Sequence, residues 1–164
     1  MGDLELWDAA APAYAGRADS FYRRVHGFLW SRLGSVQGLE VLDPGCGDGW
    51  LAEEMRLAGA RVTGIDGSGA LLARARSQYP AVDFEQRDLV LGLPWTGRRF
   101  DRIVAHMVLM DIPDLDRLLA DVAAALRLRG AFVFTIAPGL LRHGYRRRGT
   151  RRAAVPAGHQ LPPP

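Results

Sequence analysis

Three glycines alternate with other residues directly after an apolar segment, in the stretch V-L-D-P-G-C-G-D-G-W at residues 41–50. Residues 39–43 have the apolar character of a short buried strand, and residues 50–58 have apolar side chains at helical spacing. Gly45 and Gly47 permit a sharp turn and a close approach of ligand to backbone, because glycine has no Cβ atom. The helix start that follows presents unpaired N–H groups. The pattern predicts a strand–turn–helix unit that binds a small molecule.

The alternation of strand and helix continues along most of the chain. We predict strands over 39–43, 61–66, 82–87, 100–106 and 131–137, and helices over 21–36, 50–58, 69–78 and 115–128. Helices between successive strands indicate crossovers, and crossovers indicate a parallel sheet. We therefore expect an α/β fold with a doubly wound, mostly parallel Rossmann-like sheet and helices on both faces. Its ligand is expected beyond the carboxyl ends of the strands, where the strand order reverses.

Local signals predict where the helices begin and end. The side chains of Ser68 and Asp114 can cap the helices that start at residues 69 and 115. Gly38 and Gly130 are predicted to end the helices that precede them.

The charge of the chain is unevenly divided. The formal net charge is +3, and all 21 basic residues are arginine. Residues 1–138 hold 15 of these arginines and all 18 acidic residues, whereas residues 139–164 hold the other 6 and no acid. The last 26 residues are rich in Arg, Gly and Pro without strand or helix periodicity, so we predict a disordered basic tail. Because the excess positive charge belongs to this tail, we do not expect a nucleic-acid partner.

The chain is predicted to have three parts: an N-terminal helical segment or lid (1–38), an α/β ligand-binding domain (39–138) and the tail (139–164). No apolar run approaches the length of a membrane span, and the N-terminus has no signal-peptide pattern. We therefore expect a cytoplasmic protein without a membrane partner. The single cysteine, Cys46, excludes an internal disulfide and an all-cysteine zinc site, and we predict no metal site.

The spacing of the glycines narrows the class of ligand. In the dinucleotide fingerprint the third glycine lies three residues after the second, whereas Gly49 lies two residues after Gly47. The chain has no lysine, so it lacks the P-loop that binds nucleoside triphosphates. A nicotinamide-dependent oxidoreductase is disfavoured by this spacing and stays open as an alternative.

The residues V-L-D-x-G-C-G-x-G resemble motif I of the class I S-adenosylmethionine-dependent methyltransferases, and the resemblance extends from residue 1 to about residue 137. It implies S-adenosylmethionine as cofactor and methyl transfer to an acceptor, with a small molecule favoured. It also implies that Asp43, Gly45, Cys46 and Gly47 bind the cofactor.

Further positions follow the pattern of the family. Asp66 matches the acid that accepts hydrogen bonds from both ribose hydroxyls, a role that suits the two oxygens of a carboxylate. The resemblance implies that Gly67 and Ser68 border the adenine and that Leu71 covers its face. Asp88 matches the acid that pairs with the adenine amino group, and Leu89 would supply a backbone N–H to the ring.

His106 and Tyr14 also match positions of the family pattern. His106 would lie beside the methionine part of the cofactor, and a general-base role for it is the less favoured alternative. Trp7, Asp8 and Tyr14 resemble the family's W-D-x-x-A-x-x-Y opening, in which Tyr14 either reaches the cofactor carboxylate or packs in the lid. The pattern identifies no catalytic residue.

The family's sheet continues past the fifth strand, but residues 139–164 offer no strand pattern. We therefore expect five strands, with the usual last two missing, and an exposed apolar edge along 131–137. A homodimer through that edge is one expectation. The alternative to an active enzyme is a cofactor-binding domain that is truncated and catalytically incomplete.

Overall fold

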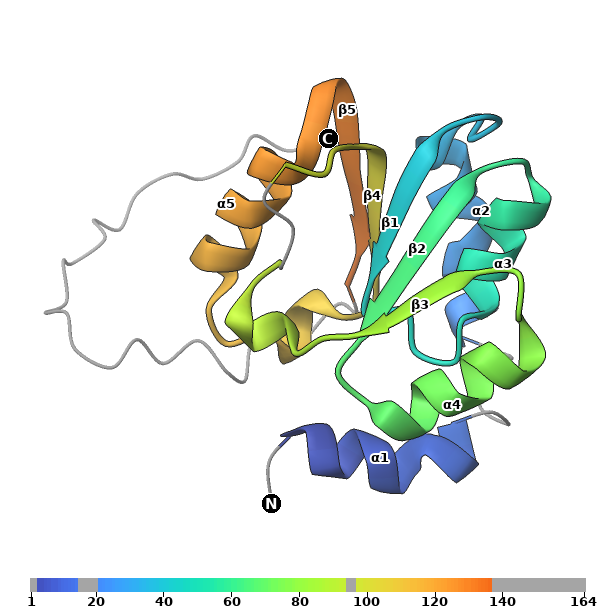
Figure 1. Ribbon diagram of the computed structural model, residues 1–164, viewed down its shortest axis with the longest axis vertical. Helices are drawn as coiled ribbons and strands as arrows, with labels where there is room; N and C mark the ends of the chain where they lie inside the picture. Colours follow the sequence, from blue (N-terminus) through green and yellow to red (C-terminus); the bar gives the residue numbers. More distant parts are fainter. Residues whose placement is uncertain (1–2, 15–20, 94–96, 137–164) are drawn as a thin grey trace, which may run out of the picture.

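A five-stranded parallel sheet forms the centre of the protein in a computed structural model that describes residues 3–14, 21–93 and 97–136 (Figure 1). The strands are β1 (Glu40–Pro44), β2 (Arg61–Asp66), β3 (Asp83–Gln86), β4 (Phe100–His106) and β5 (Leu126–Thr135), and they lie in the order β3-β2-β1-β4-β5. The strand order reverses between β1 and β4, which places the switch point at the end of β1. The expected doubly wound α/β fold is confirmed.

Helices cover both faces of this sheet. They are α1 (Asp3–Tyr14), α2 (Phe21–Leu33), α3 (Trp50–Leu57), α4 (Gly69–Gln78) and α5 (Leu115–Ala125), with the short 3-10 helices η1 (Leu89–Leu91) and η2 (Leu109–Asp111). Figure 1 shows α2 and α3 on one side of the sheet and α5 on the other. The helix α1 lies at the end of the sheet where β1 and β2 finish, next to α4.

The hydrophobic core is divided in two by the sheet, because successive residues of a strand point to opposite faces. Val41 packs with Leu29 of α2 and Met55 of α3, whereas its neighbour Leu42 packs with Leu118 of α5 on the other face. All five side chains are at most 1 % exposed. Burying a side chain of this size contributes about 1.5–3 kcal/mol, so the two layers fix the sheet relative to its helices.

Both predicted helix caps are confirmed. The Oγ of Ser68 accepts a hydrogen bond from the N–H of Leu71 at 3.2 Å. Asp114 accepts one from the N–H of Arg117 at the same distance.

The end of α2 differs from the sequence prediction. The helix ends at Leu33, because Gly34 adopts a left-handed conformation (φ +69°) and its N–H bonds to the carbonyl of Trp30. Gly38, where the helix was predicted to end, lies four residues after Gly34, in the turn before β1.

The boundary between α5 and β5 also differs. The helix ends at Ala125 rather than at residue 128, since Leu126 pairs with Phe100 and begins β5. Pairing is interrupted there and resumes where Ala131 meets Arg102, so residues 127–130 form an irregularity inside the strand. Gly130, predicted to end the helix, belongs to this irregularity.

The strand β5 is an edge of the described sheet, and Phe134 on it is 49 % exposed. Dimerisation through this edge stays a prediction. The predicted tail and any continuation of the sheet lie outside the described residues. Within the described ranges, no helix is both long enough and apolar enough to cross a membrane.

Substituting Gly49 tests how tightly the glycine turn is packed. A Cβ atom there would lie 2.6 Å from Cζ of Phe84, and the residue has φ +84°. We expect Gly49→Ala to lower the free energy of unfolding by roughly 2–5 kcal/mol, through backbone strain and overpacking. The control Gly34→Ala has a similar φ but open space, and should cost only about 1–2 kcal/mol. Urea denaturation measures both, and equal losses would contradict the packing role of Gly49.

Candidate functional site

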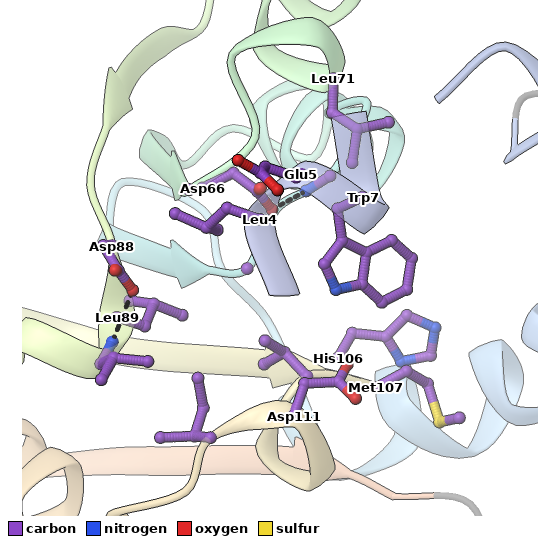
Figure 2. Close-up of a pocket in the computed structure, with 16 residues that line it drawn as sticks. Leu4, Glu5, Trp7, Asp66, Leu71, Asp88, Leu89, His106, Met107 and Asp111 are labelled. Atoms are coloured by element: carbon purple, nitrogen blue, oxygen red, sulfur yellow. Dashed lines mark hydrogen bonds between the residues drawn. The ribbon is translucent and has the colours of Figure 1, made fainter. Parts of the chain in front are cut away.

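A cavity of about 430 Å³ lies at the carboxyl ends of the central strands (Figure 2). Its walls come from the glycine turn after β1, the end of β2, the segment around η1, the turn after β4 and the helix α1. This is the position expected for the ligand of a doubly wound sheet. The volume is that of a typical small-molecule site.

The glycine turn is attached to β2 by its backbone. The N–H groups of Gly45 and Cys46 both donate to the carbonyl of Ile65, at 2.7 and 3.0 Å. Gly45 has φ +77°, and the side chain of Val108 occupies the space that a Cβ would need. Glycine is therefore required at this position both for backbone conformation and for space.

Asp66 ends β2 directly beside this turn and lines the cavity. Its Oδ2 accepts a hydrogen bond from the N–H of Gly47 at 2.9 Å (Figure 2). Its Oδ1 accepts one from the N–H of Ser68 at 2.8 Å. Burial raises the pKa of Asp66, and these backbone N–H groups oppose the rise. Each oxygen keeps a further lone pair, so the fixed carboxylate can accept two hydrogen bonds from a ligand.

Asp88 and Leu89 lie at another wall of the cavity, where β3 leads into η1. The Oδ1 of Asp88 accepts a hydrogen bond from the N–H of Val90 at 2.9 Å, which fixes the carboxylate at the start of η1. Leu89 is buried there, and Leu71 lines the cavity from α4. The cavity thus combines an apolar surface with a second fixed hydrogen-bond acceptor.

Asp43 and Cys46 line a smaller cavity of about 20 Å³ beneath the turn. The carboxyl group of Asp43 is 1 % exposed, and neither of its oxygens has a hydrogen-bond partner. Burial, together with the charge of Asp66, raises the pKa of Asp43 to about 8. Burial also raises the pKa of the Cys46 thiol, so Cys46 is not an activated nucleophile.

His106 lies between the two cavities and lines both. Its Nδ1 is 2.6 Å from Oγ1 of Thr135, and its ring packs edge-on against Trp50, with centroids 5.8 Å apart. Burial and the neighbouring His26 lower the pKa of His106 to about 4. A ring with so low a pKa is a poor general base at neutral pH, so the lowered pKa gives no support to a general-base role for His106.

The charged residues of the larger cavity are all acidic. Glu5, Asp66, Asp88 and Asp111 line it, and none of its described lining residues is an arginine. A wall of this kind disfavours a ligand with a pyrophosphate group, such as a dinucleotide. It favours a ligand that carries hydroxyl groups or positive charge.

The sequence prediction named the N-terminal segment as a lid and His106 as a site residue, but it did not identify the other residues that line the cavity from α1 and from the turn after β4. Leu4, Glu5 and Trp7 line the cavity from α1, and Met107 lines it in a left-handed conformation with φ +58°. The W-D pair at residues 7 and 8 was a usable signal, because Asp8 anchors this helix.

Asp8 connects α1 to the start of α4. Its Oδ1 accepts hydrogen bonds from Oγ of Ser68 at 2.5 Å and from the N–H of Ala70 at 3.1 Å. The side chain of Ser68 is buried in this contact and does not line the cavity, whereas Gly67 does. Tyr14 ends α1, and its side chain lies outside the described residues.

The known protein family and the curated proteins that this chain resembles are methyltransferases. Residues 41–130 match the family described as methyltransferase domain. Among curated proteins, the chain is 33 % identical over 133 residues to a malonyl-[acyl-carrier protein] O-methyltransferase of Pseudescherichia vulneris, covering 77 % of this chain and 53 % of that protein. It is 35 % identical over 122 residues to a trans-aconitate 2-methyltransferase of Paracidovorax citrulli, covering 73 % and 46 %. The chain therefore spans about half the length of these curated relatives.

Solved structures show the same likeness. An S-adenosylmethionine-dependent methyltransferase from Mesorhizobium loti superimposes with a TM-score of 0.63 at 37 % identity, over 67 % of this chain and 52 % of that one. The complex of DhpI with SAM and HEP superimposes with a TM-score of 0.67 at 28 % identity, over 80 % and 62 %.

The buried carboxyl group of Asp43 predicts how stability depends on pH. Its folded pKa of about 8 lies above the ordinary value, so between about pH 4 and pH 8 the folded state binds a proton that the unfolded state has lost. This stabilisation is complete at low pH and is lost as the pH rises toward 8. Relative to Asp43→Asn, the free energy of unfolding should fall by up to about 1.4 kcal/mol per pH unit in that range.

Denaturation at a series of pH values measures this difference. The exposed Asp83 at the start of β3 supplies a control. The free energy of unfolding of Asp83→Asn should change with pH in the same way as that of the wild type. If the free energy of unfolding of Asp43→Asn also changed with pH as that of the wild type does, the carboxyl of Asp43 would not hold its proton in the folded state.

Proposed function

The chain belongs to the class I S-adenosylmethionine-dependent methyltransferase family, and from this premise we propose that it binds S-adenosylmethionine in the larger cavity and transfers its methyl group to a small-molecule acceptor. The observation that carries the proposal is the carboxylate of Asp66. It is fixed beside the glycine turn by two backbone N–H groups and still offers an acceptor on each oxygen. This arrangement suits the adjacent hydroxyls of a ribose.

The other residues of the cavity suit the remaining parts of the cofactor. Asp88 and the backbone of Leu89 would bind the adenine, with Gly67 and Leu71 beside the ring. Gly45 and Gly47 would leave room for the methionine chain, which would then extend toward His106. The acidic lining supports this assignment, because S-adenosylmethionine carries a sulfonium and an ammonium group against one carboxylate.

The buried carboxyl group of Asp43 supports the same fit. Asp43 lies one residue before the turn, in the small cavity that shares Gly45 and His106 with the larger one. A buried acid without hydrogen-bond partners is costly in its charged form. The ammonium group of the methionine part, bound beside Gly45, would bring a charge of opposite sign close to this buried acid.

The cofactor supplies an electrophilic methyl group on a sulfonium, and displacement at that carbon depends mainly on alignment with the acceptor. We propose that the chain's contribution is therefore to position both molecules and exclude water, with α1 as a lid over the cavity. A small-molecule acceptor is supported by the relatives, one of which is named for trans-aconitate. The alternative of a cofactor-binding domain without activity receives no support from relatives that are named as methyltransferases.

A ligand panel tests this function against the oxidoreductase alternative. Calorimetry at pH 7.5 should show that S-adenosylmethionine and its demethylated product, S-adenosylhomocysteine, bind, whereas NAD does not. The acidic lining disfavours the pyrophosphate of NAD, which gives the expected selectivity its physical reason. Binding of NAD alone would overturn the proposal.

Removing the Asp66 carboxylate tests the ribose contact. Asp66→Ala should weaken cofactor binding by about 1–3 kcal/mol, because two ribose hydroxyls lose a charged acceptor. Asp83→Ala removes an exposed acid at the start of β3, which does not line the cavity, and should leave the affinity unchanged. Calorimetry on folded protein, checked by circular dichroism, measures both. Equal affinities for wild type and Asp66→Ala would remove Asp66 from the site.

A further inference from the structure

The helix α1 forms one wall of the larger cavity but buries little of its own surface. Leu4, Glu5 and Trp7 line the cavity from this helix (Figure 2). Among the described side chains of α1, only that of Ala11 is buried, at 2 % exposure. A single methyl group removes little apolar area from water, so burial alone holds α1 weakly.

Asp8 makes two polar contacts between this helix and the start of α4. Its Oδ1 accepts hydrogen bonds from the hydroxyl of Ser68 at 2.5 Å and from the N–H of Ala70 at 3.1 Å. Ser68 is 0 % exposed, and its Oγ also accepts the N–H of Leu71 in the cap of α4. The two bonds hold the pKa of Asp8 below its usual value, so its carboxylate is charged at neutral pH. Asp8 thus ties α1 to the first turn of α4.

The residues of α1 that face the rest of the protein share one side of the helix. Leu4, Asp8 and Ala11 are spaced by four and three positions, which places them on the same face. Leu4 lies directly over Gly67, where a Cβ atom would overlap the leucine side chain. Gly67 immediately precedes Ser68, so the hydrogen bonds of Asp8 and the contact of Leu4 involve adjacent residues. The bonds of Asp8 therefore also determine where Leu4 lies at the wall of the cavity.

A helix as short as α1 depends on its contacts with the rest of the protein. It has 12 residues and contains Pro12, which has no N–H to donate. Isolated helices shorter than about 12–15 residues are only marginally stable in water. Loss of docking against α4 would therefore unfold α1 and remove the wall that it gives to the cavity.

We propose that Asp8 is a positioning residue that latches α1 over the cavity, through its bonds to Ser68 and Ala70, and so slows the release of the bound cofactor. Asp8 does not itself line the cavity, so it acts through the residues of α1 that do. The identity of the cofactor rests on the proposed function. Without the carboxylate, docking of α1 would bury the hydroxyl of Ser68 without this acceptor, which favours the undocked state.

Hydrogen exchange of the free protein tests the latch without any ligand. Asp8→Ala should speed exchange of the amides of residues 4–11 roughly 3- to 10-fold, while those of β4 keep their wild-type rates. Asp8→Asn keeps an oxygen that can accept both bonds and should lie closer to the wild type. Alanine has a higher helix propensity than aspartate, so faster exchange in Asp8→Ala would not come from a weaker helix. Unchanged exchange in Asp8→Ala, or equal acceleration in β4, would overturn the proposal.

Two further variants separate the latch from a general loss of stability. Leu6→Ala removes a side chain of α1 that is 52 % exposed and does not line the cavity, and it should leave the exchange of α1 unchanged. Ser68→Ala should speed this exchange in the wild type but not in Asp8→Ala, because Asp8 is the acceptor of the hydroxyl. Additive effects of the two substitutions on α1 would contradict the latch.

The release of S-adenosylhomocysteine measures the consequence for the cofactor. Stopped-flow displacement at pH 7.5 should show that Asp8→Ala speeds dissociation roughly 3- to 10-fold, with Leu6→Ala at the wild-type rate and Asp8→Asn close to it. An unchanged dissociation rate in Asp8→Ala would overturn the role of the latch in retaining the cofactor. Failure of S-adenosylhomocysteine to bind the wild type would contradict the proposed function, and the exchange measurement would still decide whether Asp8 latches α1.

Discussion

The hydrogen bonds between the glycine turn and the end of β2 hold the candidate site together. Gly45 and Cys46 bond to the carbonyl of Ile65, and Gly47 bonds to the carboxylate of Asp66. Through these contacts β2 positions the glycine turn that follows β1. The carboxylate at the edge of the cavity is therefore set by the same bonds that shape the turn, and a shift of either would displace the other.

Much of the fold was predictable because its signals are local. The alternation of strands and helices indicated a parallel sheet, and the capping side chains of Ser68 and Asp114 marked two helix starts correctly. The boundary after α5 was wrong, because Leu126 leaves the helix to pair with Phe100, a residue distant in the sequence. The helical periodicity of residues 126–128 could not reveal that partner.

The candidate site was predictable in the segments that follow the strands, and less so elsewhere. The structure brings Gly45, Gly47, Asp66, Asp88 and His106 to one cavity, as the strand ends suggested. The participation of α1 depends on the contact of Asp8 with Ser68, which joins residues 60 positions apart. The contact of Nδ1 of His106 with Oγ1 of Thr135, at 2.6 Å, likewise joins residues of two different strands. Such contacts arise from packing between distant elements, and in the sequence only the W-D pair at residues 7 and 8 pointed to the first of them.

The acidic wall of the cavity has a consequence for the order of events in a catalytic cycle. Glu5, Asp66, Asp88 and Asp111 give it negative charge without an arginine among the described lining residues. Methyl transfer converts a sulfonium into a neutral thioether, so the proposed reaction would remove one positive charge from the occupant of this wall. The attraction that helps to load the cavity would weaken at the moment of product formation. S-adenosylhomocysteine would therefore dissociate more readily than S-adenosylmethionine. Added salt would screen this difference in attraction, so product inhibition would become stronger as the salt concentration rises.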